Sequence, residues 1–169
     1  MDIRSEEFEN LVAAYQRLVF AACFSFTKNY FSAEDLAQET FMAAYRNLNR
    51  FDGRNPKAWL VKIAANKCKD YLKSPKNQPS GEMLDLLADA RGSPEEQFLE
   101  EDAAGQVKRL CESLKEPYRL VALAYFCEEQ KLSELARQTG ENLKTLETRL
   151  QRAKKLLRTL WKEESREAS

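Results

Sequence analysis

Polar and cationic side chains gather near the end of the chain, at spacings that place most of them on one side of a helix. They are Lys144, Thr145, Thr148, Arg149, Gln151, Arg152 and Lys155. Residues three and four apart are neighbours on a helix surface, so this set forms one cationic face. Guanidinium, amide and hydroxyl groups contact the phosphates and base edges of duplex DNA. The pattern favours nucleic-acid binding over chemistry on a small molecule.

The residue types that most enzymes need are missing. The chain has no histidine among its 169 residues, which excludes His-ligated zinc, His-based triads and His general bases. The four cysteines, Cys23, Cys68, Cys111 and Cys127, lack metal-ligand spacing. We expect each to be a buried free thiol within a helix, with redox sensing as the alternative. The sequence therefore predicts no metal site, no cofactor and no enzymatic activity.

A second polar surface recurs at helical spacing in the middle of the chain: Trp59, Lys62, Asn66, Lys69 and Lys73. The loop before it adds Phe51 and Arg54. Aromatic rings together with ammonium groups and an amide suit unstacked, single-stranded DNA, where stacking and backbone contacts dominate. Trp59 has a second interpretation, because a tryptophan at this spacing more often packs into a helical core.

A third surface precedes these two. Gln38, Glu39, Met42 and Arg46 lie three, four, seven and eleven residues after Asp35, which places all five on one stripe of a helix. The stripe can be an ordinary solvated outer face. The alternative is a docking surface, where carboxylates pair with cations of a helical partner and Met42 adds an adaptable apolar contact.

Helices are needed to position all three surfaces, and the sequence predicts little else. Apolar periodicity predicts helices over residues 5–27, 33–48, 56–73, 94–114 and 117–128, followed by a helix-turn-helix at 132–140 and 143–161. Ser32 with Asp35, and Asn55 with Pro56, are typical of helix starts. In the second helix, Ala37, Phe41, Ala44 and Leu48 are expected to face inward.

The helix-turn-helix has its own local signals. Gly140 lies where the turn needs a left-handed backbone, and Asn142 is expected to cap the following helix. That helix has one apolar stripe: Leu143, Leu146, Leu150, Ala153, Leu157 and Leu160. It can therefore pack on its partner helix while its polar side enters a major groove.

The organisation is all-α, with two small helical domains joined by a flexible linker. Residues 74–81 contain two prolines and a glycine, so we place the boundary there: 1–76, an acidic linker 77–93 and 94–169, with a short helix expected around 83–87. No signal peptide or membrane span is expected, and the location is predicted to be cytoplasmic.

Charge supports this division. The formal net charge is zero, with 27 cationic and 27 anionic residues. Residues 46–76 nevertheless carry nine Lys/Arg against Asp52 and Asp70, and residues 144–162 carry seven against Glu147 alone. Two basic blocks separated by an acidic one can form local positive surfaces that a summed charge conceals.

Two segments together resemble a known family. SAEDLAQETFMAAYRNLNRFDGR (32–54) with AWLVKIAANKCKDYL (58–72) resembles region 2 of the bacterial extracytoplasmic-function (ECF) sigma factors, of the sigma-70 family. KLSELARQTGENLKTLETRLQRAKKLLR (131–158) resembles their region 4, and SPEEQFLEE resembles the usual entry into it. Three positions depart from the family pattern: Pro56 stands where relatives usually have an aromatic residue, Glu147 where many have a basic one, and Glu141 where an apolar turn residue is common.

The resemblance implies a dissociable promoter-recognition subunit of bacterial RNA polymerase. Asp35, Gln38 and Glu39 would dock on the clamp-helix coiled coil of the core enzyme. The region around Phe51, Arg54, Lys62, Asn66 and Lys69 would read the melted −10 element, and Thr148, Arg149 and Arg152 the duplex −35 element. An anti-sigma factor is the expected regulatory partner.

Two other functions account for part of the sequence. A stand-alone helix-turn-helix regulator would bind DNA without core polymerase, but it leaves the Asp35 stripe and the central basic face unexplained. A helical adaptor that binds only proteins is the other class, and weak affinity for DNA at low salt would identify it.

Overall fold

The computed structural model describes residues 3–73 and 94–167, with side chains described for 4–73 and 103–167. The chain divides into two compact units, Met1–Glu96 and Gln97–Ser169. The described residues are helical and contain no strand, which confirms the all-α prediction. The linker and the short helix expected around 83–87 lie outside the described residues. None of the helices described is both long enough and apolar enough to cross a lipid bilayer.

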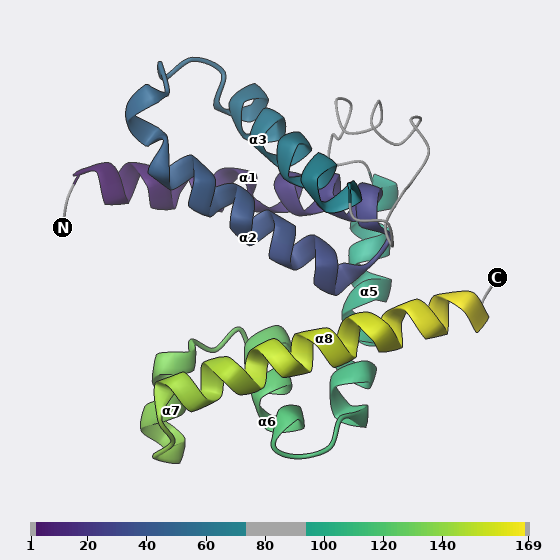
Figure 1. The fold of residues 1–169 in the computed structure, drawn as a ribbon. Coiled ribbons are helices and arrows are strands. Elements are labelled where there is room, and N and C mark those ends of the chain that lie inside the picture. The colour runs from purple at the N-terminus through teal and green to yellow at the C-terminus, as the bar shows by residue number, and fades with distance from the viewer. Residues whose placement is uncertain (1–2, 74–93, 168–169) are drawn as a thin grey trace. The chain divides into compact units, whose positions relative to one another are not determined.

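Unit 1 is built from three helices that pack against one another (Figure 1): α1 Ile3–Thr27, α2 Tyr30–Arg46 and α3 Pro56–Leu72. A one-turn 3-10 helix, η1 Leu48–Arg50, follows α2. Each helix contributes residues at three- and four-residue intervals to one core: Val19, Ala22, Cys23, Phe26, Ala33, Leu36, Ala44, Leu60, Ala64 and Cys68. Burial of this shared apolar face is what holds the three helices together.

The start of α2 differs from the prediction. The N-cap is Asn29, whose Oδ1 accepts hydrogen bonds from the backbone N–H groups of Phe31 (3.1 Å) and Ser32 (3.4 Å). Ser32 is buried inside the first turn and does not cap the helix. Asn29 has extended backbone angles, φ −135° and ψ 118°, from which its side chain can reach these donors. An asparagine three residues upstream therefore replaces the serine.

The buried face of α2 is also rotated from the predicted one. Leu36, Thr40, Ala43 and Ala44 are buried, whereas Ala37 and Phe41 are only half-buried. Leu48 is also half-buried and belongs to η1, because α2 ends at Arg46. Thr40 can lie in the core because its Oγ1 donates to the Leu36 carbonyl at 2.7 Å. The apolar periodicity missed Thr40 because threonine is polar. Its hydroxyl is tolerated in the core only because it makes this hydrogen bond.

The start of α3 agrees with its local signals. Asn55 Oδ1 accepts from the backbone N–H of Ala58 at 3.2 Å, and Pro56 occupies the first turn. Asn55 adopts a left-handed conformation with φ 45°, which asparagine tolerates better than most residues. The preceding loop therefore ends abruptly and α3 begins in a fixed position.

Unit 2 contains α5 Pro94–Ser113, α6 Tyr118–Ala122, η2 Leu123–Cys127, α7 Leu132–Thr139 and α8 Leu143–Glu167. One core cluster joins α6, η2, α7 and α8: Val121, Ala124, Leu135, Leu146 and Leu150. Arg109 of α5 forms an ion pair with Glu164 of α8.

The prediction of one helix over 117–128 was wrong in detail. The α-helix α6 ends at Ala122, and η2 follows as a π-helix in which the Glu128 N–H donates to the Leu123 carbonyl (3.0 Å).

Candidate nucleic-acid interface

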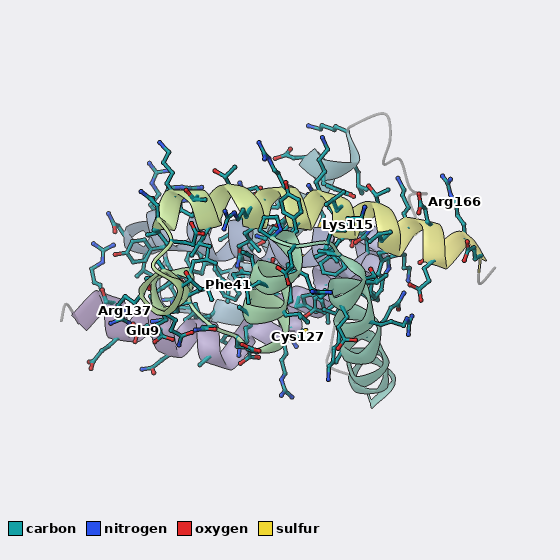
Figure 2. The ribbon with its side chains drawn as sticks, turned by 90° about the horizontal axis from the view of Figure 1, so that it is seen from below. Glu9, Phe41, Lys115, Cys127, Arg137 and Arg166 are labelled. Atoms are coloured by element: carbon teal, nitrogen blue, oxygen red, sulfur yellow. The ribbon has the colours of Figure 1, made fainter. Side chains whose placement is uncertain are left out.

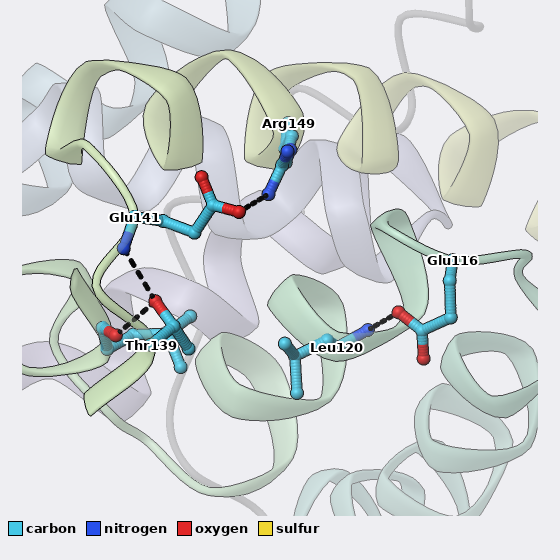
Figure 3. Close-up of polar contacts among 6 residues, drawn as sticks. Glu116, Leu120, Thr139, Glu141 and Arg149 are labelled. Atoms are coloured by element: carbon cyan, nitrogen blue, oxygen red, sulfur yellow. Dashed lines mark hydrogen bonds and ion pairs between the residues drawn. The ribbon is translucent and has the colours of Figure 1, made fainter.

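The turn between α7 and α8 is fixed by four local hydrogen bonds. Gly140 has φ 75° and ψ 4°, and its N–H donates to the Ala136 carbonyl at 2.9 Å. Thr139 Oγ1 accepts from the Glu141 N–H at 3.2 Å and donates to the Leu135 carbonyl at 2.8 Å (Figure 3). Asn142 Oδ1 accepts from the Lys144 N–H at 2.8 Å. The roles predicted for Gly140 and Asn142 are confirmed, and α8 begins in a defined direction.

One face of α8 is buried and the other is polar. The buried side chains are Leu146, Leu150, Ala153, Lys154, Leu157 and Trp161. Leu143 is 42% exposed and Leu160 only half-buried, so the ends of the predicted stripe differ from the observed one. Lys154 is 4% exposed, and its Nζ lies 5.1 Å from the centre of the Tyr125 ring. That cation belongs to the interior of unit 2 and not to the cationic surface.

The predicted cationic face of α8 lies outward. Lys144, Thr148, Gln151, Arg152 and Lys155 are exposed, whereas Thr145 and Arg149 are half-buried. Thr145, Thr148, Arg149 and Arg152 line a hollow of about 410 Å³, to which Pro117 and Tyr118 also contribute. Two guanidinium groups and several hydroxyls in one hollow can bind a phosphate or the acceptor edge of a base.

The carboxylate of Glu141 lies next to this hollow, which the sequence did not predict. Glu141 Oε1 lies 3.5 Å from Arg149 Nη1 (Figure 3). Glu147, the other carboxylate near this face, is exposed and makes no ion pair with any residue that the structure describes. The spacing of eight residues between Glu141 and Arg149 gives no helical signal, because a turn separates them.

In unit 1, the predicted single-strand surface is partly a packing surface. The Phe51 and Trp59 rings stack with centroids 4.3 Å apart and planes at 14°, and Trp59 packs against the core. The polar residues of the surface, Arg54, Lys62, Asn66, Lys69 and Lys73, are exposed. Trp59 therefore packs as one interpretation predicts, and the ring of Phe51 anchors the loop to α3; contact of either ring with DNA stays a prediction.

The loop before α3 is itself ordered by short contacts. Asp52 Oδ1 accepts from the Arg54 N–H at 2.8 Å, and Gly53 has φ 83° between them. At the far end of α3, Lys73 lies 3.9 Å from Asp70, and both side chains are largely exposed. Such an exposed pair is worth little, so Lys73 stays available to a phosphate.

The predicted docking stripe is on the surface of α2. Gln38, Glu39, Met42 and Arg46 are exposed and Asp35 is half-buried. Met42 is 57% exposed and Tyr45 is 52% exposed, which is unusual for large apolar side chains beside one another. An exposed carboxylate-rich row thus continues into an apolar patch.

The apolar patch contains a hollow that the sequence did not reveal. Phe8 of α1 and Phe41, Met42, Tyr45 and Arg46 of α2 line a space of about 300 Å³; Phe41 is labelled in Figure 2. The Phe8 and Tyr45 rings meet edge to face with centroids 5.0 Å apart. Tyr45 follows Met42 by three residues and was a detectable neighbour, whereas Phe8 is distant in sequence and needed the fold.

The cysteines form two pairs and no metal site. No cluster of three potential metal ligands occurs in the described part of the chain. Cys23, Cys68 and Cys111 are buried, but Cys127 is exposed, which corrects the expectation for that residue. A hydrogen bond with Cys68, followed by burial, raises the pKa of Cys23, and burial raises the pKa of Cys111 to about 12. Burial of the thiol also raises the pKa of Cys127, which hydrogen-bonds Cys111.

Comparison with known proteins connects unit 1 to a family. The model of the sigma-70 region 2 family matches residues 11–77, which cover α1 from its third turn, α2 and α3. That span includes the predicted docking stripe and the Phe51–Trp59 stack. The match thus covers both unit 1 surfaces.

Curated relatives extend the similarity beyond unit 1. RNA polymerase sigma factor SigV of Bacillus subtilis is 31% identical over 82% of this chain and 81% of its own length. ECF RNA polymerase sigma factor SigW of the same organism is 26% identical over 90% of this chain and 88% of its own. The probable RNA polymerase sigma factor RfaY of Xanthomonas campestris is 30% identical over 90% of this chain, which spans only 40% of that relative. The chain belongs to the ECF group of RNA polymerase sigma factors.

Proposed function

We propose that this protein binds core RNA polymerase and directs promoter-specific initiation of transcription. The observation that carries the proposal is the combination in one chain of a sigma-70 region 2 unit with a second unit ending in a helix-turn-helix. A stand-alone helix-turn-helix regulator would need only the second unit. The family similarity of unit 1 favours the polymerase-dependent function.

The α2 stripe is the proposed docking site for the coiled coil of the core enzyme. Asp35, Gln38 and Glu39 supply carboxylates and an amide to cationic and polar side chains of a helical partner. The hollow beside Met42, about 300 Å³ in volume, has room for an apolar side chain of the same partner. Charge then sets the register of docking, and apolar burial in the hollow slows dissociation.

The two basic surfaces are the proposed promoter contacts. Arg54, Lys62, Asn66 and Lys69 are exposed where they can hold phosphates and an unstacked base of the −10 element. The polar face of α8, with Thr148, Arg149 and Arg152, is the surface proposed to read the −35 element in the major groove. Thr148 Oγ1 donates to the Lys144 carbonyl at 3.0 Å, so its lone pairs are directed to donors on the DNA.

In this function the chain performs no covalent chemistry. Binding of separated bases lowers the free energy of the open promoter, and the bond-forming steps belong to the core enzyme. Activity of this kind takes place in the cytoplasm, and control by an anti-sigma factor that covers the docking stripe or the α8 face is part of the proposal.

Run-off transcription with purified core polymerase tests the proposal. Core enzyme plus this chain should give a transcript of defined length from a promoter selected by the reconstituted holoenzyme, and core enzyme alone should give none. A stand-alone regulator would bind duplex DNA but yield no transcript with core enzyme. Absence of a chain-dependent transcript on every promoter of a genomic library would contradict the proposal.

A further inference from the structure

Glu141, in the turn of the helix-turn-helix, reaches the recognition helix with its carboxylate. Its Oε1 lies 3.5 Å from Arg149 Nη1, with 45% of the Glu141 side chain and 27% of the Arg149 side chain exposed (Figure 3). Arg149 is one of the residues proposed to contact the −35 element. Before DNA arrives, its guanidinium therefore already has an anionic partner from within the chain.

The backbone on both sides of Glu141 holds this carboxylate in place. Its own N–H is bound by Thr139 Oγ1, the preceding Gly140 is in the left-handed region, and the following Asn142 caps α8. The Cα of Glu141 is thereby fixed relative to the first turn of α8. Only its side-chain torsions remain to be ordered, which lowers the entropy cost of keeping the pair.

Arg149 has a second side that the pair leaves available. Glu141 contacts Nη1, whereas a guanidinium carries five N–H donors in a planar fork. The same side chain lines the hollow of about 410 Å³ together with Arg152, Thr145 and Thr148. A base edge can be approached from the hollow while the contact with Glu141 is kept.

Phosphates and base edges are affected differently by this carboxylate. A phosphate that approaches Arg149 meets the negative charge of Glu141, and taking over the arginine exchanges one anion for another. The acceptor edge of a guanine is uncharged and has no such repulsion. Phosphate contacts carry affinity for DNA of any sequence, whereas base contacts carry specificity.

We propose that Glu141 is a specificity-determining residue, which withholds Arg149 from backbone phosphates and reserves it for a base of the −35 element. This inference rests on the proposed recognition of −35 DNA by α8. It goes beyond that function because it assigns a role to an acidic residue. Glu141 would weaken binding to DNA of any sequence while increasing the preference for the −35 element.

The test compares the full-length chain with its Glu141→Gln variant, which keeps the size and polarity of the side chain. Fluorescence anisotropy is measured on two labelled duplexes, one selected from a random pool by wild-type holoenzyme and one with the same bases shuffled. Removing the carboxylate makes one more cation available to phosphate, so affinity for the shuffled duplex should rise about threefold to eightfold. Affinity for the selected duplex should change by less than about twofold, so the ratio of the two affinities falls.

Glu147→Gln is the matched control. It removes an equal charge from the same helix-turn-helix, at a carboxylate that pairs with no described residue. This variant should leave the affinity ratio within about twofold of the wild-type value. In an Arg149→Gln background, the Glu141→Gln change should have no further effect on the ratio, since the coupled partner is gone.

Three results would overturn the inference: an unchanged ratio in Glu141→Gln, an equal fall in Glu147→Gln, or a fall that persists without Arg149. Circular dichroism of each variant shows whether the helices are intact. Failure of the proposed function has a different signature, because core enzyme with the wild-type chain would then select no duplex from the pool and give no chain-dependent transcript, and the inference would fall with it.

Discussion

At the scale of single residues, the four cysteines differ in burial and therefore in expected reactivity. Cys23, Cys68 and Cys111 lie inside the two cores, and Cys127 is exposed at the end of η2 (Figure 2). The thiolate is the reactive form, and the raised pKa of Cys127 makes that form scarcer at neutral pH than in an ordinary surface cysteine.

We expect iodoacetamide to modify Cys127 alone in the native protein. The rate should be low at neutral pH and increase as the pH rises, because thiolate forms only as the pH approaches the raised pKa. The three buried thiols should react only in denaturant. Peptide mass spectrometry identifies the modified residue, and native modification of Cys23 or Cys68 would contradict the burial described here.

At the scale of elements, the turn between α7 and α8 depends on the conformation of Gly140. With φ 75°, a side chain is strained at this position although no atom lies within 4 Å of an added Cβ. Gly140→Ala should therefore lower the free energy of unfolding by about 1–2 kcal/mol through backbone strain alone. Urea unfolding followed by circular dichroism measures the change.

Gly105 provides the matched control for this substitution. It lies within α5, has no close neighbours around an added Cβ, and its backbone is not in the left-handed region. Gly105→Ala should raise stability by about 0.5–1 kcal/mol, since alanine is the better helix former. Two Gly→Ala changes in the same unit are thus expected to have opposite signs, and equal signs would count against the turn geometry.

The exposed stripe on α2 is expected to determine the affinity of the chain for core polymerase. Asp35→Ala combined with Gln38→Ala should weaken binding to core polymerase roughly tenfold or more, because the partner's charged groups lose their counterparts in the interface. Helix content should stay the same, since neither residue belongs to the core. Competition against labelled wild-type chain gives the affinity, and Glu163→Ala, an exposed carboxylate of α8, serves as the control. Undiminished core binding would remove the docking assignment.

At the scale of the whole molecule, a formal net charge of zero conceals two cationic surfaces. Binding of the chain to a −35 duplex should consequently fall roughly tenfold or more between about 50 and about 200 mM KCl, as counterions compete for the phosphates. Arg152→Ala should reduce the slope of log K against log salt by about one if this side chain contacts a phosphate. A salt-independent affinity would exclude the phosphate contacts.

Local signals made much of the fold predictable. Asn55 with Pro56, Gly140 and Asn142 each determine a helix end through their own side chain or backbone, so their roles could be read without the rest of the chain. The helices expected over 5–27 and 56–73 agree with α1 and α3 within two residues. Their long apolar repeats leave no competing arrangement of the backbone.

What the sequence could not provide depends on contacts between distant segments. The hollow formed by Phe8 and Tyr45, the Glu141–Arg149 pair and the burial of Lys154 under Tyr125 all join residues from different elements. The Ser32 prediction failed for another reason: Asn29 and Ser32, three residues apart, can both cap a helix, and periodicity cannot choose between them. Helix ends with a single capping candidate were predicted correctly.

The chain has two tryptophans, and the fold assigns one to each unit. Trp59 of α3 stacks on Phe51, whereas Trp161 of α8 is buried. Replacing either one with phenylalanine leaves a single tryptophan, and its selectively excited emission reports on one unit only. Each unit thus carries its own optical probe, by which changes at the proposed docking surface of unit 1 and at the proposed DNA-binding face of unit 2 can be followed separately in stopped-flow experiments.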